Sequence, residues 1–256
     1  MSDPVVVEKL DDGAYWRVAL GGSKGNILDA RLMQALSVVW ADAAADRHVK
    51  ALCLEGEGTH FSFGASVAEH LPANVESMLK QFHGLLLSLV DASVIVMAAV
   101  RGQCLGGAME LVTLCHRVFA SKEAKFGQPE IVLGVFAPAA SVLLAERVGR
   151  GAAEDLCLSG RSITAAEAFR IGLVDEITEA DPAEAAQAYA RTHLLPRSAS
   201  SLRLAARAAR VGLRARLAAE LPEVERIYLK ELMATHDAVE GLQAFLEKRA
   251  AAWRDQ

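Results

Sequence analysis

The stretch RGQCLGGAMEL at residues 101–111 is the most informative part of this sequence for the fold. It follows the uncharged run SVIVMAAV at 93–100, which is typical of a central strand buried on both faces. The glycine pair 106–107 then predicts a tight turn into a helix, with free N–H groups at the positive end of the helix dipole. Glu110 follows about one helical turn later, in apolar surroundings. A carboxyl group there is costly unless it is paired, hydrogen-bonded or functional.

The segments on either side predict alternating strands and helices, and therefore an α/β architecture. A hairpin joined at DDG and a helix capped by Asp29 are expected near the N-terminus. The expected strands are 4–10, 15–20, 49–56, 93–102, 116–121 and 124–131, and the expected helices are 28–46, 74–90 and 105–115.

The composition changes after Pro196, where residues that favour helix dominate. We therefore predict two parts: residues 1–195 form an α/β core, and residues 196–256 form a helical C-terminal subdomain. Breaks in the second part are expected at Gly212, Pro222 and Gly241.

Composition and charge exclude several classes of protein. The chain of 256 residues is 52% hydrophobic and 23% charged, with a net charge of −5, so it can bury a large core. The acidic balance argues against nucleic-acid or membrane-surface binding. The four cysteines form no CxxC or Cys/His cluster, so we expect no metal site. With no targeting segment apparent, we expect a cytoplasmic protein.

Two further stretches contain candidate functional residues. In FSFGAS at 61–66, Gly64 allows close approach to the backbone, and the N–H of Ala65 is free to face a cleft. In FGQPEI at 126–131, Glu130 follows Pro129 in an apolar setting. Glycine loops are often only turns, and either glutamate is equally compatible with a solvent-exposed position. Together, however, two acids and two amide donors suit proton transfer beside a carbonyl group whose oxygen gains negative charge.

These motifs resemble those of the crotonase, or enoyl-CoA hydratase/isomerase, superfamily over nearly the whole chain. The strings HFSFGAS, VRGQCLGG, FGQPEI and ELMATHDAVEGL are most similar to the cyclohexa-1,5-diene-1-carbonyl-CoA hydratases of anaerobic aromatic degradation. The resemblance implies a spiral of ββα units with a helical trimerisation subdomain, and trimers or hexamers.

The resemblance also implies roles for individual residues. The N–H groups of Ala65 and Gly107 would form an oxyanion hole. Glu110 would mainly activate water, and Glu130 would mainly protonate carbon. No separate cofactor is implied, because coenzyme A is part of the substrate.

Three other positions match family segments that contact coenzyme A, and a fourth lies where the sequence departs from the family pattern. Lys24 lies near a basic position that contacts coenzyme A, and Phe245 and Lys248 match C-terminal residues that reach its adenine end. An ordinary amphipathic helix is the alternative for these two. The segment GVFAPAAS at 134–141 replaces the family's usual run of glycines, and this favours Phe136 as a residue lining the substrate pocket.

The expected reaction is reversible hydration of a conjugated cyclic dienoyl-CoA thioester. A hydratase for straight-chain 2-enoyl-CoA needs the same two acids and is the nearest alternative. A non-catalytic crotonase-fold binding protein, such as an RNA-binding relative, is an alternative of a different class.

Overall fold

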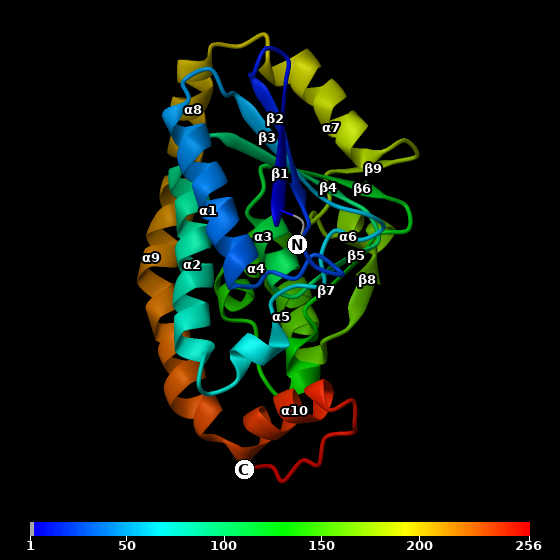
Figure 1. Ribbon diagram of the computed structural model, residues 1–256, viewed down its shortest axis with the longest axis vertical. Coiled ribbons are helices and arrows are strands. Elements are labelled where there is room, and N and C mark those ends of the chain that lie inside the picture. Colours follow the sequence, from blue (N-terminus) through cyan, green and yellow to red (C-terminus); the bar gives the residue numbers. More distant parts are fainter. Residues whose placement is uncertain (1–2) are drawn as a thin grey trace.

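The computed structural model describes residues 3–256, and two sheets form its centre (Figure 1). The larger sheet has the strand order β1-β2-β3-β4-β6-β9, and the smaller has the order β5-β7-β8. The strands are β1 (Val5–Leu10), β2 (Tyr15–Leu20), β3 (Ala51–Gly56), β4 (Ile95–Val100), β5 (Gln103–Leu105), β6 (Arg117–Ser121), β7 (Lys125–Gly127), β8 (Ser162–Thr164) and β9 (Glu176–Thr178).

From β4 to β7, successive strands alternate between the two sheets, as in a spiral. β4 pairs in the larger sheet and β5, two residues later, in the smaller one; β6 and β7 repeat this arrangement. All neighbours in the larger sheet are parallel except β1 and β2, which form the predicted hairpin. Asp11 and Asp12 adopt positive φ values of 51° and 55° in its turn, as a tight hairpin connection requires.

Helices cover both faces of the larger sheet. α1 (Ala30–Ala45), α2 (Val75–Asp91), α3 (Gly107–Thr113) and α4 (Pro138–Val148) contribute to the main core on one face. α7 (Pro182–Tyr189) covers the other face, where Ala183 and Ala186 pack on Tyr15 and Phe119. These small alanine side chains let α7 lie close to the strands.

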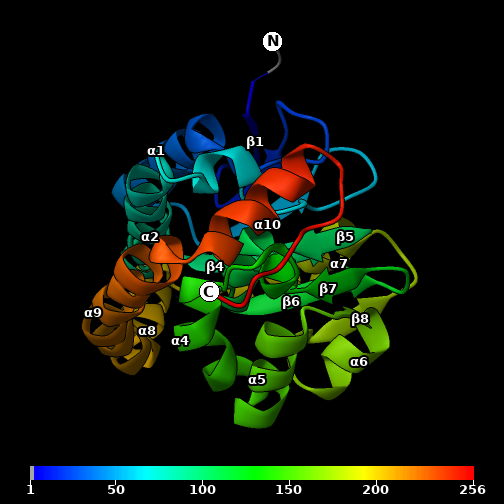
Figure 2. The same ribbon diagram turned by 90° about the horizontal axis from the view of Figure 1, so that it is seen from below.

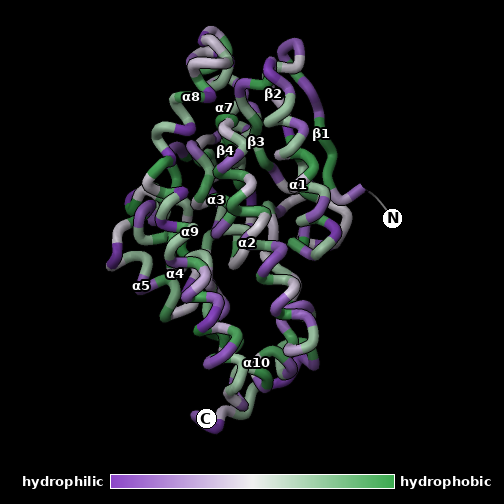
Figure 3. The backbone as a smooth tube through the Cα atoms, turned by 90° about the vertical axis from the view of Figure 1, so that its left-hand side faces the viewer, coloured by the Kyte–Doolittle hydropathy of each residue, from purple (hydrophilic) through white to green (hydrophobic). Residues whose placement is uncertain are grey.

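The remaining helices are α5 (Arg150–Ser159), α6 (Ala165–Arg170), α8 (Ala199–Ala209), α9 (Val211–Arg226) and α10 (His236–Leu246). α9 runs beside α2, and α10 lies across the lower end of the molecule (Figures 1 and 2). Hydrophobic and hydrophilic residues alternate along α2 and α9, as expected for helices with one buried face (Figure 3). Among residues 3–256, no helix is both long enough and apolar enough to cross a bilayer.

Two predictions about local structure are wrong. The strand expected over 124–131 ends at Gly127, and Pro129–Leu133 forms a 3₁₀ helix, η2, because proline fixes φ and has no N–H to pair. The C-terminal helices also run through the breaks expected at Pro222 and Gly241, whereas the chain does break beside Gly212, at Arg210 between α8 and α9. In α9, Leu217 and Leu221 are buried one helical turn apart, just before Pro222. Their packing outweighs the low helix propensity of the proline. The division at residue 196 stays a prediction.

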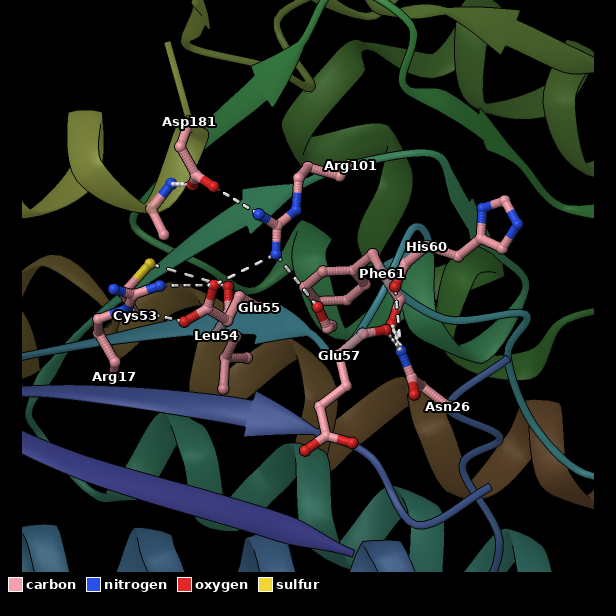
Figure 4. Close-up of polar contacts among 12 residues, drawn as sticks. Arg17, Asn26, Cys53, Leu54, Glu55, Glu57, His60, Phe61, Arg101 and Asp181 are labelled. Carbon is pink, nitrogen blue, oxygen red and sulfur yellow. Dashed lines mark hydrogen bonds and ion pairs between the residues drawn. The ribbon is translucent and has the colours of Figure 1, made fainter. Parts of the chain in front are cut away.

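An ion-pair network ties the larger sheet to α7 (Figure 4). The Glu55 carboxylate at the end of β3 is buried and pairs with Arg17 at 2.7 Å and with Arg101 at 3.5 Å. Arg101 also donates to Asp181, the N-cap of α7, at 2.5 Å. The buried charge is therefore compensated, and the network holds the chain where β4 leads into the glycine turn.

Candidate active site

The glycine pair places α3 directly beside the loop that carries Ala65. Gly106 caps α3 with a φ of 54°, and Gly107 is the first helical residue. A Cβ atom on Gly107 would lie 3.5 Å from the Ala65 nitrogen, so the two amides predicted as oxyanion donors are neighbours. Within residues 3–256, neither of these N–H groups donates a hydrogen bond to a backbone or side-chain acceptor. Both donors remain available for a ligand.

Glu110 is anchored at the start of another helix. Its side chain is only 4% exposed, and the Ala140 N–H donates to its Oε1 at 2.5 Å. Ala140 belongs to the first turn of α4, whose N–H groups have no partner within their own helix. Burial raises the pKa of Glu110, and the N–H groups of Ala139 and Ala140 partly offset that effect by stabilising the carboxylate. The segment GVFAPAAS thus supplies the N–H group that holds the Glu110 carboxylate.

Glu130 is on η2. A Cβ atom on Gly106 would lie 2.5 Å from its Oε1, so a side chain at position 106 would displace this carboxyl group. Burial raises the pKa of Glu130, and the negative charge of Glu110 raises it further. The Gln128 amide, oriented so that both its ends are satisfied, donates to the Glu130 Oε2 at 3.0 Å and to Oε1 at 3.3 Å.

The two carboxyl groups therefore differ in how readily they lose a proton. Helix N–H groups favour the charged form of Glu110, whereas Glu130 experiences the repulsion of that charge. Near neutral pH, Glu110 ionises first and Glu130 keeps its proton. The pair then consists of one base and one acid, close enough for the charge of Glu110 to act on Glu130.

A small cavity opens beside Glu130 and Ala65, whereas Glu110 and Gly107 are not among the residues that line it. Its lining includes Ala65, Gly106 and the Glu130 side chain, and the remainder is mostly apolar: Phe63, Val67, Pro129, Leu133, Val135 and Leu242, with His70. An apolar wall of this kind excludes bulk water from Glu130 and strengthens the electrostatic interactions inside the cavity.

Four predicted contacts lie outside this cavity. Lys24 is exposed and lines a separate groove with His60 and Phe63. Phe245 is exposed near the end of α10, and Lys248 follows the helix with a φ of 56°. Phe136 packs edge-on against Tyr228, with ring centroids 5.2 Å apart, and does not line the cavity. The roles assigned to these residues stay predictions, as do those of the two acids and the two amides.

Sequence reasoning missed the residues that shape the oxyanion loop. The Asn26 Nδ2 donates to the carbonyls of Glu57, His60 and Phe61, each at 3.0 Å (Figure 4). The buried Ser62 hydroxyl donates to the Asn26 carbonyl at 2.7 Å and accepts the Gly64 N–H at 3.0 Å. These contacts fix the loop immediately before Ala65.

We expect Ser62→Ala to lower kcat about tenfold while leaving the fold intact. The change leaves the buried N–H of Gly64 without an acceptor, at a cost of about 1–3 kcal/mol, and frees the loop to shift. Kinetics and thermal melting measure the two effects. Ser37→Ala is the matched control, because that hydroxyl bonds within α1 to Met33 O, away from the cavity. Equal kcat values for the two variants would remove Ser62 from the positioning network.

Comparison with known proteins identifies the family of this chain. Residues 20–256 match the family model described as enoyl-CoA hydratase/isomerase, so the chain belongs to this family. It is a hydro-lyase with the crotonase fold. Its relatives include the cyclohexa-1,5-dienecarbonyl-CoA hydratase of Thauera aromatica, which is 50% identical over 255 residues covering 100% of this chain and 98% of that protein.

Two matches of lower identity show how widely the fold is shared. A probable enoyl-CoA hydratase of Rhizobium meliloti is 37% identical, with 90% of each chain covered. The crystal structure of an enoyl-CoA hydratase from Mycobacterium avium subsp. paratuberculosis superposes with a TM-score of 0.84 at 25% identity, covering 98% of this chain and 99% of that one. The fold is therefore common to hydratases of different names.

Proposed function

We propose that this protein adds water reversibly to cyclohexa-1,5-diene-1-carbonyl-CoA, giving 6-hydroxycyclohex-1-ene-1-carbonyl-CoA in anaerobic aromatic degradation. The family supports hydration of enoyl-CoA thioesters. The cyclic substrate is supported by one observation, the 50% identity to the Thauera aromatica enzyme over the full length of the chain.

The arrangement of acids and amides suits this reaction. Water attacks the ring carbon β to the thioester and gives a proton to Glu110, while the negative charge passes to the thioester oxygen. The N–H groups of Ala65 and Gly107 stabilise that oxygen. Glu130 then delivers its proton to the far end of the conjugated system, which completes a 1,4-addition. A proton then passes from Glu110 to Glu130, which returns both carboxyl groups to their starting states.

The rest of the substrate is coenzyme A, for which we propose Lys24, Phe245 and Lys248 as contacts and no separate cofactor. Exposed apolar side chains such as Leu204 and Val211 on the C-terminal helices support subunit contacts in a homotrimer or hexamer. Cytoplasmic location remains part of the proposal.

The decisive experiment compares the purified protein on cyclohexa-1,5-diene-1-carbonyl-CoA and crotonyl-CoA in parallel. We expect kcat/KM to favour the cyclic diene strongly. A preference for crotonyl-CoA would instead establish the straight-chain hydratase, the function suggested by the Rhizobium meliloti relative. Loss of both activities together with specific RNA binding would establish a non-catalytic binding protein.

The pH dependence of kcat/KM is expected to be bell-shaped. Activity requires ionised Glu110 and protonated Glu130, so it rises as the first proton leaves the pair and falls as the second leaves. Because burial raises the pKa of both groups, the acidic limb lies well above the ordinary carboxyl value of about 4.3. Initial rates from about pH 5 to about pH 10 test this, with circular dichroism excluding unfolding. A rate that stays constant down to the ordinary carboxyl pKa would contradict it.

A further inference from the structure

His70 lies on the wall of the same cavity as Glu130 and has no part in the reaction described above. It is the last residue of the 3₁₀ helix η1 (Val67–His70), which follows the loop of Ala65. Of the ten residues lining the cavity, only His70 and Glu130 have ionisable side chains. A second polar group in a mostly apolar lining is a candidate for fixing the orientation of a ligand.

The hydrogen bond of the imidazole ring determines which nitrogen carries the proton. The Nδ1 atom lies 2.8 Å from the Ser66 carbonyl oxygen, which can only accept, so Nδ1 is the donor. In the neutral ring, the lone pair is then on Nε2. Burial lowers the pKa of His70, which keeps the ring neutral at physiological pH. The side chain therefore presents an acceptor and no donor at Nε2.

The Nε2 atom has no partner among residues 3–256, but it is not sealed inside the protein. The Nε2 atoms of His83 and His116 are fully enclosed without a hydrogen bond, whereas that of His70 stays accessible. A neutral acceptor on the wall of a reaction cavity suits a ligand that brings an O–H donor.

We propose that the Nε2 of His70 accepts a hydrogen bond from the hydroxyl group of the hydrated acyl-CoA. The unhydrated thioester has no O–H to donate, so His70 favours the hydroxyacyl form. This inference rests on the proposed function, because it concerns the same cavity and the product formed there. It makes His70 a determinant of specificity for hydroxylated acyl groups.

The test measures binding of two ligands that differ in the hydroxyl group. Calorimetry is carried out in the Glu110→Gln background, where turnover is suppressed, with 6-hydroxycyclohex-1-ene-1-carbonyl-CoA and with cyclohex-1-ene-1-carbonyl-CoA. We expect His70→Leu to weaken binding of the hydroxylated ligand roughly tenfold, which corresponds to the loss of one hydrogen bond. The affinity for the ligand without the hydroxyl group should change less than about twofold. His70→Gln keeps an acceptor and should restore most of the loss.

Controls separate this role from a structural one. His48→Leu, at an exposed position, should change neither affinity, and melting curves report whether each variant folds. The proposal would be overturned if His70→Leu weakened the binding of both ligands equally, or weakened the binding of neither. If the wild-type protein prefers crotonyl-CoA, the same comparison is made with 3-hydroxybutyryl-CoA and butyryl-CoA, so the proposed cyclic substrate can fail without deciding the role of His70.

Discussion

Replacing either Glu110 or Glu130 by glutamine is expected to reduce kcat about 10²–10⁴-fold, the usual contribution of one general acid or base. The amide keeps the shape of the side chain but neither accepts nor releases a proton at this point of the reaction. Because the two groups act in opposite protonation states, each variant should also lose one limb of the pH profile. Glu110→Gln should lose the acidic limb and Glu130→Gln the alkaline limb.

Steady-state hydration rates and the affinity for a coenzyme A thioester test this prediction together. Affinity should change little, because neither carboxyl group is a proposed contact for coenzyme A. Glu220→Gln on α9 is the matched control, since within residues 3–256 its only ion pair is an exposed one with Arg216, 3.8 Å away. Rates within tenfold of wild type for both active-site variants would exclude the proposed proton transfers.

Gly64→Ala is expected to damage the oxyanion hole directly. Gly64 has a φ of 88°, and an added Cβ would lie 2.4 Å from the Leu105 carbonyl oxygen and 3.2 Å from the Gly107 nitrogen. The methyl group must push the Ala65 loop away from α3 and so separate the two amide donors. We expect kcat to fall about 10²–10³-fold, as for loss of one oxyanion donor, and stability to fall by about 1–3 kcal/mol.

The control is a glycine at which an added methyl group has room. A Cβ on Gly84, in the middle of α2, meets no atom within 4 Å, so Gly84→Ala should raise stability by about 0.5–1 kcal/mol and leave kcat unchanged. Denaturant titration and hydration kinetics measure both variants. An unaltered kcat in Gly64→Ala would show that the amides of Ala65 and Gly107 do not act as a pair.

The local parts of the fold and site were predictable because their signals lie close together in the sequence. The Asp29 cap is confirmed by its acceptance of the Leu32 N–H at 2.8 Å, and the turn at Gly106 is confirmed by its positive φ. The adjacency of Ala65 and Gly107 followed from the family resemblance, since nothing in the spacing of two glycine loops requires them to meet.

The partners of the acids could not be predicted, because they depend on packing between distant elements. Glu110 meets the N–H of Ala140 thirty residues away only once α4 has docked on α3. Asn26 reaches three carbonyls more than thirty residues further on, and its side chain gives no local sign of this role. The position of the Phe136 ring likewise depends on a distant residue, because it packs against Tyr228 and not on the cavity wall.

The buried carboxyl pair also sets a trade-off between activity and stability. Both pKa values are raised in the folded protein, so the folded state binds protons that the unfolded chain releases near neutral pH. The contribution of this pair to folding stability is therefore greatest below the unfolded carboxyl pKa and is lost as pH rises through the folded values. The protein gives up stability at its working pH to keep two acids buried together, so a substitution that removes one of these charges stabilises the fold and slows the reaction.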